Sequence, residues 1–375
     1  MPKLGYRMNT RSLNFISSLW NFSSNENSVY LTHGLYRWYG KLVPQLVAKV
    51  LDLYTQPNDS IIANFSGSGT IALEAMLRNI NCIGTDINPL ALLLAKVKTT
   101  KLRIDSINLL IEQILNEAKK IENTVSVSHL YQPEKWYSGR SAYKLVALKK
   151  TIDKIENRDI RDFLYITLAA ITRECSNMDS RCVNHIVLDK NSKEKDVYNT
   201  FKGAVVNSYE DIKKLNDIQT NSQISFLKHT ASDMEYVADS SIDLVFSHPP
   251  YLNAVNYYNI YRLSTDLLEM KYDEIRDEDF SAKKIDVFLK FMKMSFAESY
   301  RVLKKNKRCV VVIGDTRYKG NLITLQVDFV NLLKECGFAI EDMFIWEMNR
   351  KAGMNVARRG NFIDHNFVIV AKKEK

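Results

Sequence analysis

A short segment with one imidazole, two prolines and one aromatic ring directly follows an apolar stretch that is typical of a buried strand. The apolar stretch covers residues 242–246, and the segment reads Ser247-His248-Pro249-Pro250-Tyr251. Proline fixes the backbone φ angle and has no N–H, so the carbonyl groups before the prolines can point outward as hydrogen-bond acceptors. The ring of Tyr251 offers a surface on which a flat heterocycle can stack. These residue types predict a rigid site for a planar group that carries an amine.

A glycine-rich turn lies upstream, after the apolar residues 60–63, and reads Asn64-Phe65-Ser66-Gly67-Ser68-Gly69-Thr70. Glycine lets the backbone approach a ligand closely, and the N-terminus of the next helix, expected over residues 71–78, favours negative groups. The following strand-like stretch ends at Asp86, just before Ile87. A nucleoside-binding α/β fold has at this point the carboxylate that accepts hydrogen bonds from ribose hydroxyls.

With GTDINP between them, the FSGSGT and SHPPY motifs resemble those of the S-adenosylmethionine-dependent amino-methyltransferases of DNA. The segment over residues 33–45, before the glycine-rich turn, and LNAVNY, after the SHPPY motif, extend the resemblance. It covers about residues 33–100 and 229–370. It implies an α/β fold with a Rossmann-like seven-stranded methyltransferase sheet, S-adenosyl-L-methionine as cofactor and double-stranded DNA as partner.

The resemblance also assigns cofactor contacts, which come from four parts of the sequence. They are Tyr39 and Lys41 over the methionine carboxylate, the turn residues Asn64, Phe65, Ser66, Gly67, Gly69 and Thr70, then Asp86 and Ile87 at the ribose, and Asp233 at the adenine amine. Each has a structural alternative. Asp86 can instead cap the helix that starts near Pro89, Asp233 can be a surface turn residue, and Tyr39 can pack in the core.

The chain departs from the family pattern in two places. Ala63 and Asn64 stand where Asp-Pro is usual, and His248 stands where Asp, Asn or Ser accepts a hydrogen bond from the target amine. A neutral imidazole can still accept, whereas an imidazolium cannot. We therefore expect activity to fall at low pH. The alternative is that His248 only packs, or that the protein has lost activity.

The five residues of the SHPPY segment, Ser247, His248, Pro249, Pro250 and Tyr251, form the expected catalytic set. An exocyclic amine is a poor nucleophile because its lone pair is delocalised into the ring. The Pro249 carbonyl and the His248 ring nitrogen would draw its hydrogens out of the ring plane and favour the transition state. Such a pocket requires a flipped-out or single-stranded base. The absence of a Pro-Cys motif argues against attack by a thiolate on cytosine carbon 5.

The LNAVNY continuation favours cytosine N4 as the target, so the sequence predicts a cytosine-N4-specific DNA methyltransferase, with a cognate restriction endonuclease as a further partner. Adenine N6 is the first alternative. Methylation of an RNA amine and a catalytically inactive nucleic-acid-binding homologue are the others.

Composition bounds these expectations. The chain has 375 residues, 46% of them hydrophobic, and a net charge of +9, which suits a polyanionic partner. The 5 cysteines have no paired short spacing, so neither a zinc site nor a disulfide framework is expected. No apolar stretch reaches the length of about 20 residues that a membrane span needs, and no signal peptide is recognisable. We expect a cytoplasmic protein without a metal site.

Short apolar runs alternate with helical patterns, which predicts a parallel sheet wrapped by helices. Strands are expected over residues 61–63, 82–84, 224–227, 244–246 and 309–313, followed by a terminal hairpin of residues 339–348 and 361–372. We divide the chain into a cofactor-binding part (1–100), a helical insertion (101–220) and a catalytic part (221–375).

The helical insertion is a candidate DNA-recognition region, with a cap that contacts no DNA as the alternative. Candidate nucleic-acid contacts lie in the insertion and in a basic loop near the end of the chain. They are Arg173, Arg181, Arg350, Lys351, Arg358 and Arg359.

Overall fold

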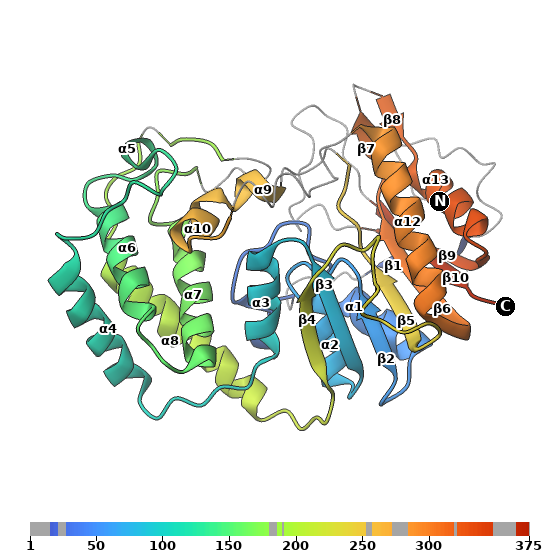
Figure 1. Ribbon diagram of the computed structural model, residues 1–375, viewed down its shortest axis with the longest axis horizontal. Helices are drawn as coiled ribbons and strands as arrows, with labels where there is room; N and C mark the ends of the chain where they lie inside the picture. Colours follow the sequence, from blue (N-terminus) through green and yellow to red (C-terminus); the bar gives the residue numbers. More distant parts are fainter. Residues whose placement is uncertain are drawn as a thin grey trace.

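A single twisted sheet organises the molecule (Figure 1). The computed structural model describes residues 16–21, 28–179, 186–189, 191–252, 257–271, 284–318, 321–347 and 365–374. In these residues, eight strands pair in the order β1-β9-β10-β6-β5-β2-β3-β4. They are β1 (Ile16–Asn21), β2 (Ser60–Ala63), β3 (Asn81–Asp86), β4 (Ile224–Lys228), β5 (Ile242–Ser247), β6 (Leu303–Ile313), β9 (Ala339–Glu347) and β10 (His365–Lys372). A separate short hairpin joins β7 (Thr316–Tyr318) and β8 (Asn321–Ile323).

The expected α/β fold is confirmed, and every predicted strand occurs in the sheet. β10 is antiparallel to both β6 and β9, so the terminal hairpin forms as predicted, while the other strand pairs are parallel. The sheet has one strand more than we expected, because β1 adds to its edge in parallel with β9. This strand escaped prediction because no motif marks it and its partner β9 lies more than 300 residues away along the chain.

Helices cover both faces of the sheet. α1 (Pro44–Tyr54) and α2 (Thr70–Leu77) pack on one face. α12 (Ile285–Val302) and α13 (Leu325–Glu335) pack on the other. All six residues of β5 are buried, as expected for a central strand of a parallel sheet with two covered faces. α3 (Pro89–Thr99) packs against β3, β4 and α2.

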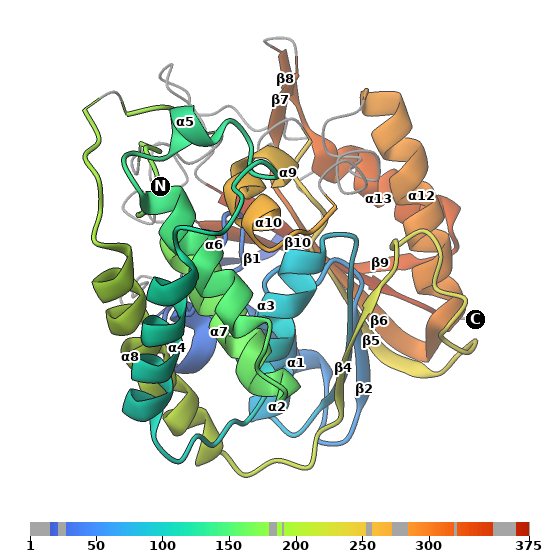
Figure 2. The same ribbon diagram turned by 60° about the vertical axis from the view of Figure 1, so that its left-hand side comes forward.

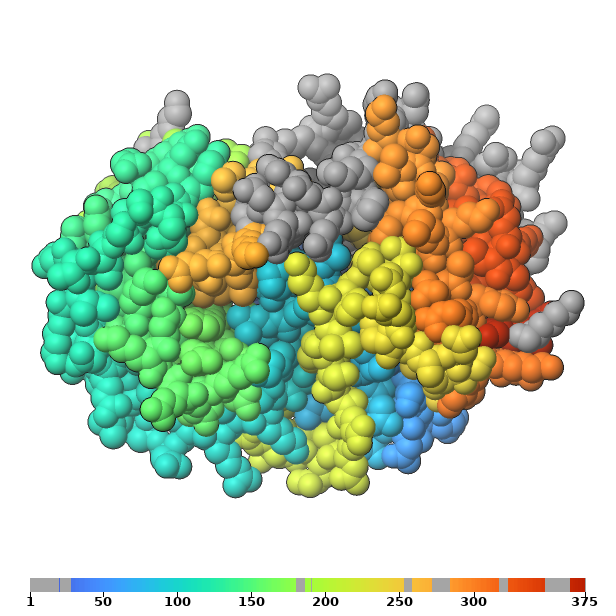
Figure 3. All heavy atoms as spheres, in the orientation of Figure 1, coloured from blue at the N-terminus to red at the C-terminus, as the bar shows by residue number. Residues whose placement is uncertain are grey.

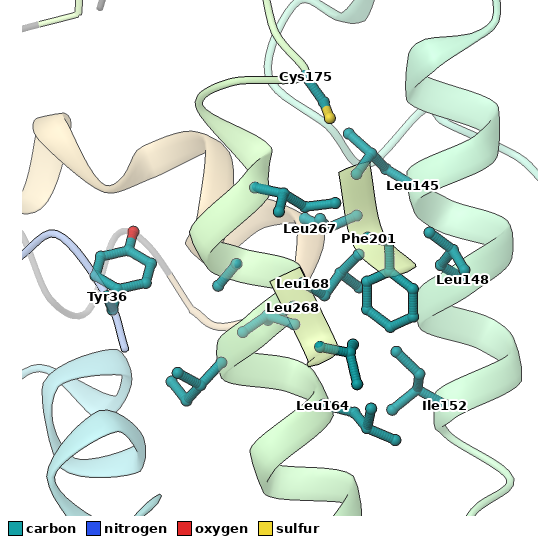
Figure 4. Packing of buried hydrophobic residues seen from close by; sticks show 14 of the residues in the cluster. Tyr36, Leu145, Leu148, Ile152, Leu164, Leu168, Cys175, Phe201, Leu267 and Leu268 are labelled. Atoms are coloured by element: carbon teal, nitrogen blue, oxygen red, sulfur yellow. The ribbon is translucent and has the colours of Figure 1, made fainter. Parts of the chain in front are cut away.

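The stretch between α3 and β4 is helical. It contains α4 (Ile107–Ile121), α5 (Pro133–Trp136), α6 (Ser141–Ile152), α7 (Arg158–Thr172) and α8 (Val197–Asn216). Figure 2 shows α4, α6, α7 and α8 side by side. Figure 4 shows Leu145, Leu164 and Phe201 in the buried hydrophobic core that these helices share.

The core of this helical unit extends into two other parts of the chain. It includes residues of α3 and of the segment that follows η3 (Leu31–Gly34), such as Tyr36 and Trp38. It also includes α9 (Tyr257–Ile260) and α10 (Arg262–Leu267), which come directly after the SHPPY segment. Figure 3 shows the helical unit, in teal and green, at the opposite end of this face from α12, in orange. In the described residues, no helix is long and apolar enough to cross a membrane.

The turn before α2 generates a prediction for stability. Gly69 has a φ of +76°, and a Cβ added to it would lie 2.6 Å from the Cβ of Ala95 in α3. We expect Gly69→Ala to lower the free energy of unfolding by roughly 1–3 kcal/mol, because of backbone strain and overpacking. Urea unfolding followed by circular dichroism measures this change.

Gly203→Ala is the matched control. Gly203 lies within α8, and no heavy atom lies within 4 Å of an added Cβ. Alanine should stabilise this helix by roughly 0.5–1 kcal/mol. An equal effect of the two substitutions would contradict the close contact at Gly69.

Candidate functional site

The carboxyl ends of four neighbouring strands surround one pocket. It encloses about 1010 Å³, including its open mouth. Its walls are residues Trp38–Leu42, Asn64–Ser68, Thr70–Ile71, Asp86–Asn88, His229–Ala231 and His248–Pro250, with Tyr258 and Phe291. The glycine-rich turn and the SHPPY segment therefore open into the same space, although about 180 residues separate them. Ligands of open α/β sheets bind at this edge.

Backbone hydrogen bonds shape the glycine-rich turn. The Ser66 N–H donates to the Thr85 carbonyl (2.8 Å), and the Gly69 N–H donates to the Ser66 carbonyl (2.9 Å). The Gly67 N–H donates to Asp86 Oδ2 (2.8 Å), so the carboxylate at the end of β3 holds the turn at the end of β2. Gly67 and Gly69 both have positive φ angles, which explains the choice of glycine at these two positions.

Asp86 faces the pocket and does not cap α3. Its Oδ1 accepts a hydrogen bond from the Asn88 N–H at 2.9 Å. The cap of α3 is Asn88, whose Oδ1 accepts from the Leu90 N–H at 3.0 Å. The helix-cap alternative for Asp86 is therefore wrong. A carboxylate oxygen can accept more than one hydrogen bond, so the contacts to these backbone N–H groups are compatible with a contact to a ligand hydroxyl.

The residues before α1 form another wall of the pocket. Trp38 stacks on Tyr261 with ring centroids 4.1 Å apart, and the Tyr39 N–H donates to the Tyr261 hydroxyl (2.6 Å). Lys41 donates to the His33 carbonyl (3.1 Å), and burial lowers the pKa of Lys41. Sequence reasoning found Tyr39 and Lys41 but missed Tyr261, which has no motif of its own.

Two guanidinium groups lie beside Tyr39. The Cζ atom of Arg37 is 5.2 Å from the centroid of the Tyr39 ring, and that of Arg173 is 5.4 Å from it. Arg173 also donates to the Asp179 carbonyl (3.0 Å). Of the predicted nucleic-acid contacts, Arg173 is thus near the pocket wall. The others, Arg181, Arg350, Lys351, Arg358 and Arg359, lie outside the described residues.

The SHPPY segment divides between pocket and core. His248, Pro249 and Pro250 line the pocket, whereas Ser247 is fully buried in the sheet. Burial lowers the pKa of His248 to about 4, so the imidazole is neutral at neutral pH. His248 therefore has a ring nitrogen that can accept a hydrogen bond.

The structure differs from our expectation for Tyr251. The ring belongs to the core on one face of the sheet and does not line the pocket. Its hydroxyl donates to Asn366 Oδ1 (3.1 Å) and lies 3.3 Å from His248 Nε2. Because the hydroxyl finds these hydrogen-bond partners inside the protein, the ring lies in the core and not in the pocket. Other aromatic rings line the pocket and could stack on a flat group, and among them are those of Tyr258 and Phe291, which sequence reasoning missed.

Asp233 lies in the turn after β4, and its Oδ1 accepts from the Glu235 N–H at 3.3 Å. It is not among the residues that line the pocket. The earlier residues of the same turn, His229 to Ala231, line it instead. The predicted role of Asp233 at the adenine amine stays a prediction.

The chemistry of the lining suits the expected cofactor. The Asp86 carboxylate can accept from ribose hydroxyls, Lys41 carries a positive charge, and Phe65, Ile87 and Phe291 provide apolar surface for a purine. Asn64, in place of the usual proline, also lines the pocket and is held by α12, because its Nδ2 donates to Ser299 Oγ (3.4 Å).

Two known proteins are similar in sequence to parts of this chain. Over 277 residues, the chain is 23% identical to the type II methyltransferase M.MvaI of Kocuria varians, covering 67% of this chain and 60% of that protein. Over 93 residues, it is 37% identical to the type II methyltransferase M.MjaII of Methanocaldococcus jannaschii, covering 25% of this chain and 18% of that protein. The chain thus spans less than two thirds of either relative.

Among solved structures, a SAM-dependent methyltransferase from Methanosarcina mazei aligns with 87% of this chain and 97% of its own, at 15% identity and a TM-score of 0.36. A TehB-like SAM-dependent methyltransferase from Corynebacterium glutamicum aligns with 88% of this chain and 87% of its own, at 11% identity and a TM-score of 0.34.

The sequence profile of a family described as DNA methylase matches residues 6–97 and 242–375, which flank the helical stretch. The predicted resemblance is confirmed, and with it S-adenosyl-L-methionine as the cofactor. Because the profile matches more than half of its 375 residues, the chain belongs to the N6/N4 DNA methylase family.

Proposed function

We propose that the protein transfers a methyl group from S-adenosyl-L-methionine to the exocyclic N4 of a cytosine flipped out of double-stranded DNA. One observation carries the proposal: the glycine-rich turn and the residues His248, Pro249 and Pro250 line the same pocket. A cofactor held by the turn and an amine held by the SHPPY segment would then meet. The LNAVNY continuation favours cytosine over adenine N6, which is the second candidate.

Several pocket residues are suited to holding the cofactor. Asp86 would accept from the ribose hydroxyls, since its carboxylate is already oriented by the Gly67 and Asn88 N–H groups. Lys41 and Tyr39 would lie at the methionine carboxylate. Ile87 and Phe291 would bury the purine. The bound cofactor supplies an electrophilic methyl group.

On the substrate side, the chain has to make the amine a better nucleophile. The Pro249 carbonyl and a nitrogen of the neutral His248 ring are the two acceptors that would take the hydrogens of the amine. As the lone pair loses conjugation with the ring, these hydrogen bonds strengthen, so they stabilise the transition state more than the ground state. Tyr258 replaces Tyr251 as the aromatic surface proposed to contact the base.

Binding of the DNA phosphates requires positively charged side chains near the pocket. Arg37 and Arg173 are suited to phosphate contacts, because both lie beside the pocket-lining ring of Tyr39. We propose that the helical stretch from α4 to α8, which adjoins them, contributes to recognition of the DNA sequence. We propose that the enzyme acts in the cytoplasm. A cognate restriction endonuclease would be its partner there.

The first test is a methyl-transfer assay with labelled S-adenosyl-L-methionine on duplex DNA of mixed sequence and on total RNA. Nucleoside mass spectrometry should find N4-methylcytosine in the DNA. N6-methyladenine would move the proposal to the second candidate, and label confined to RNA would overturn the DNA substrate.

The role of His248 predicts a pattern of substitutions. His248→Asn keeps an acceptor and should retain activity, whereas His248→Leu should lower kcat by roughly 10²-fold or more. Wild-type kcat should also stay level from pH 8 to pH 5. It should fall only as the pH drops through about 4, because protonation then turns the acceptor into a donor. An acid limb centred near pH 6.5 that disappears in His248→Asn would contradict the lowered pKa of this ring.

The role of Asp86 predicts a change in cofactor affinity. Asp86→Asn loses the charge and part of its acceptor capacity, so the Kd of S-adenosyl-L-methionine should rise roughly tenfold, as measured by calorimetry. Glu117→Gln is the control, since Glu117 lies on α4 and contributes nothing to the pocket. An unchanged Kd in Asp86→Asn would remove the ribose contact from the proposal.

A further inference from the structure

A short chain of hydrogen bonds leads from the pocket into the sheet. His248 Nε2 lies 3.3 Å from the Tyr251 hydroxyl, and that hydroxyl donates to Asn366 Oδ1 at 3.1 Å. Asn366 is on β10, more than 100 residues after the SHPPY segment, and only 1% of it is exposed. Neither Tyr251 nor Asn366 lines the pocket. The chain of hydrogen bonds therefore approaches His248 from the side opposite to the substrate.

The direction of these hydrogen bonds determines where the imidazole carries its proton. Oδ1 of an asparagine can only accept, so the single hydrogen of the Tyr251 hydroxyl is committed to it. The same hydroxyl can then only accept from His248, which requires a hydrogen on Nε2. A neutral imidazole has one N–H, so Nδ1 is left with a free lone pair.

The surrounding backbone keeps the three residues in place. Gly314 follows β6, and a Cβ added to it would collide with Asn366 Oδ1 and lie 3.0 Å from Tyr251 Cε1. The end of the loop is also anchored, because Thr316 Oγ1 donates to the Leu252 carbonyl at 2.6 Å. Absence of a side chain at position 314 thus lets the tyrosine and the asparagine meet.

We propose that Asn366 is a positioning residue, which through Tyr251 selects the Nε2–H tautomer of His248 and leaves Nδ1 as the acceptor for the target amine. This role rests on the proposed function, because it gives His248 the task of accepting from an amine. It also accounts for the burial of Tyr251: the hydroxyl of this residue is used to orient the imidazole, and its ring does not stack on the base.

The tautomer can be measured without any reaction. We would label the histidine rings of the full chain with ¹⁵N and record two-bond ¹⁵N–¹H correlations at pH 7. The signals of His248 are those missing from His248→Asn. We expect a single Nε2–H tautomer in the wild type and in Asn366→Asp, which keeps an oxygen acceptor. In Asn366→Leu the two tautomers should mix, and kcat should fall roughly tenfold while the Kd of S-adenosyl-L-methionine stays unchanged.

Tyr251→Phe provides a second route to the same result, because it removes the hydroxyl without touching β10 and remains usable if Asn366→Leu fails to fold. An Nδ1–H tautomer in the wild type would overturn the proposal, and so would an unchanged tautomer in both Tyr251→Phe and Asn366→Leu. The result is separate from the proposed function. Failure of the wild type to methylate DNA would reject the substrate, while the tautomer measurements would still decide the role of Asn366.

Discussion

The parallel pairing of β2 with β5 is the constraint on which the site depends. In the register of this pair, Ala63 lies opposite Phe246. The next residues along the two strands, Asn64 and Ser247, begin the glycine-rich turn and the SHPPY segment. Parallel strands end at the same edge of a sheet, so one register brings two segments from distant parts of the chain to one level. A shift of one of these strands by one residue would also turn the side chains of that strand to the other face of the sheet.

A second set of contacts closes the site from the side of the helical unit. The stacking of Trp38 on Tyr261 joins the residues before α1 to those after the SHPPY segment. The hydrogen bond from the Tyr39 N–H to the Tyr261 hydroxyl strengthens the same junction. The pocket wall before α1 and the residues after the SHPPY segment thus share one buried aromatic contact. A displacement of the segment after Pro250 that moves Tyr261 would therefore also displace the wall that contains Tyr39 and Lys41.

His248 replaces the usual small acceptor of the family with a larger ring, and the structure contains features that suit this replacement. Burial keeps the imidazole neutral by lowering its pKa to about 4. The hydroxyl of Tyr251 and the amide of Asn366 supply polar partners for the ring nitrogen that faces the interior. A histidine that was exposed and without such partners would be partly charged near neutral pH, and either nitrogen could carry its proton.

The sequence by itself determined the family, the alternation of strands and helices, and the residues of the glycine-rich turn, because these depend on local patterns and on short motifs. It also located most of the pocket, from Tyr39 and Asp86 to Pro249. Only the tertiary structure decided the edge position of β1, the burial of Tyr251 and the contacts of Tyr261 and Asn366. Each of these depends on contacts between residues far apart in the chain, and a lone tyrosine or asparagine has no local pattern that names its partner. Physical contact in the folded state, and not residue type, sets the role of such residues.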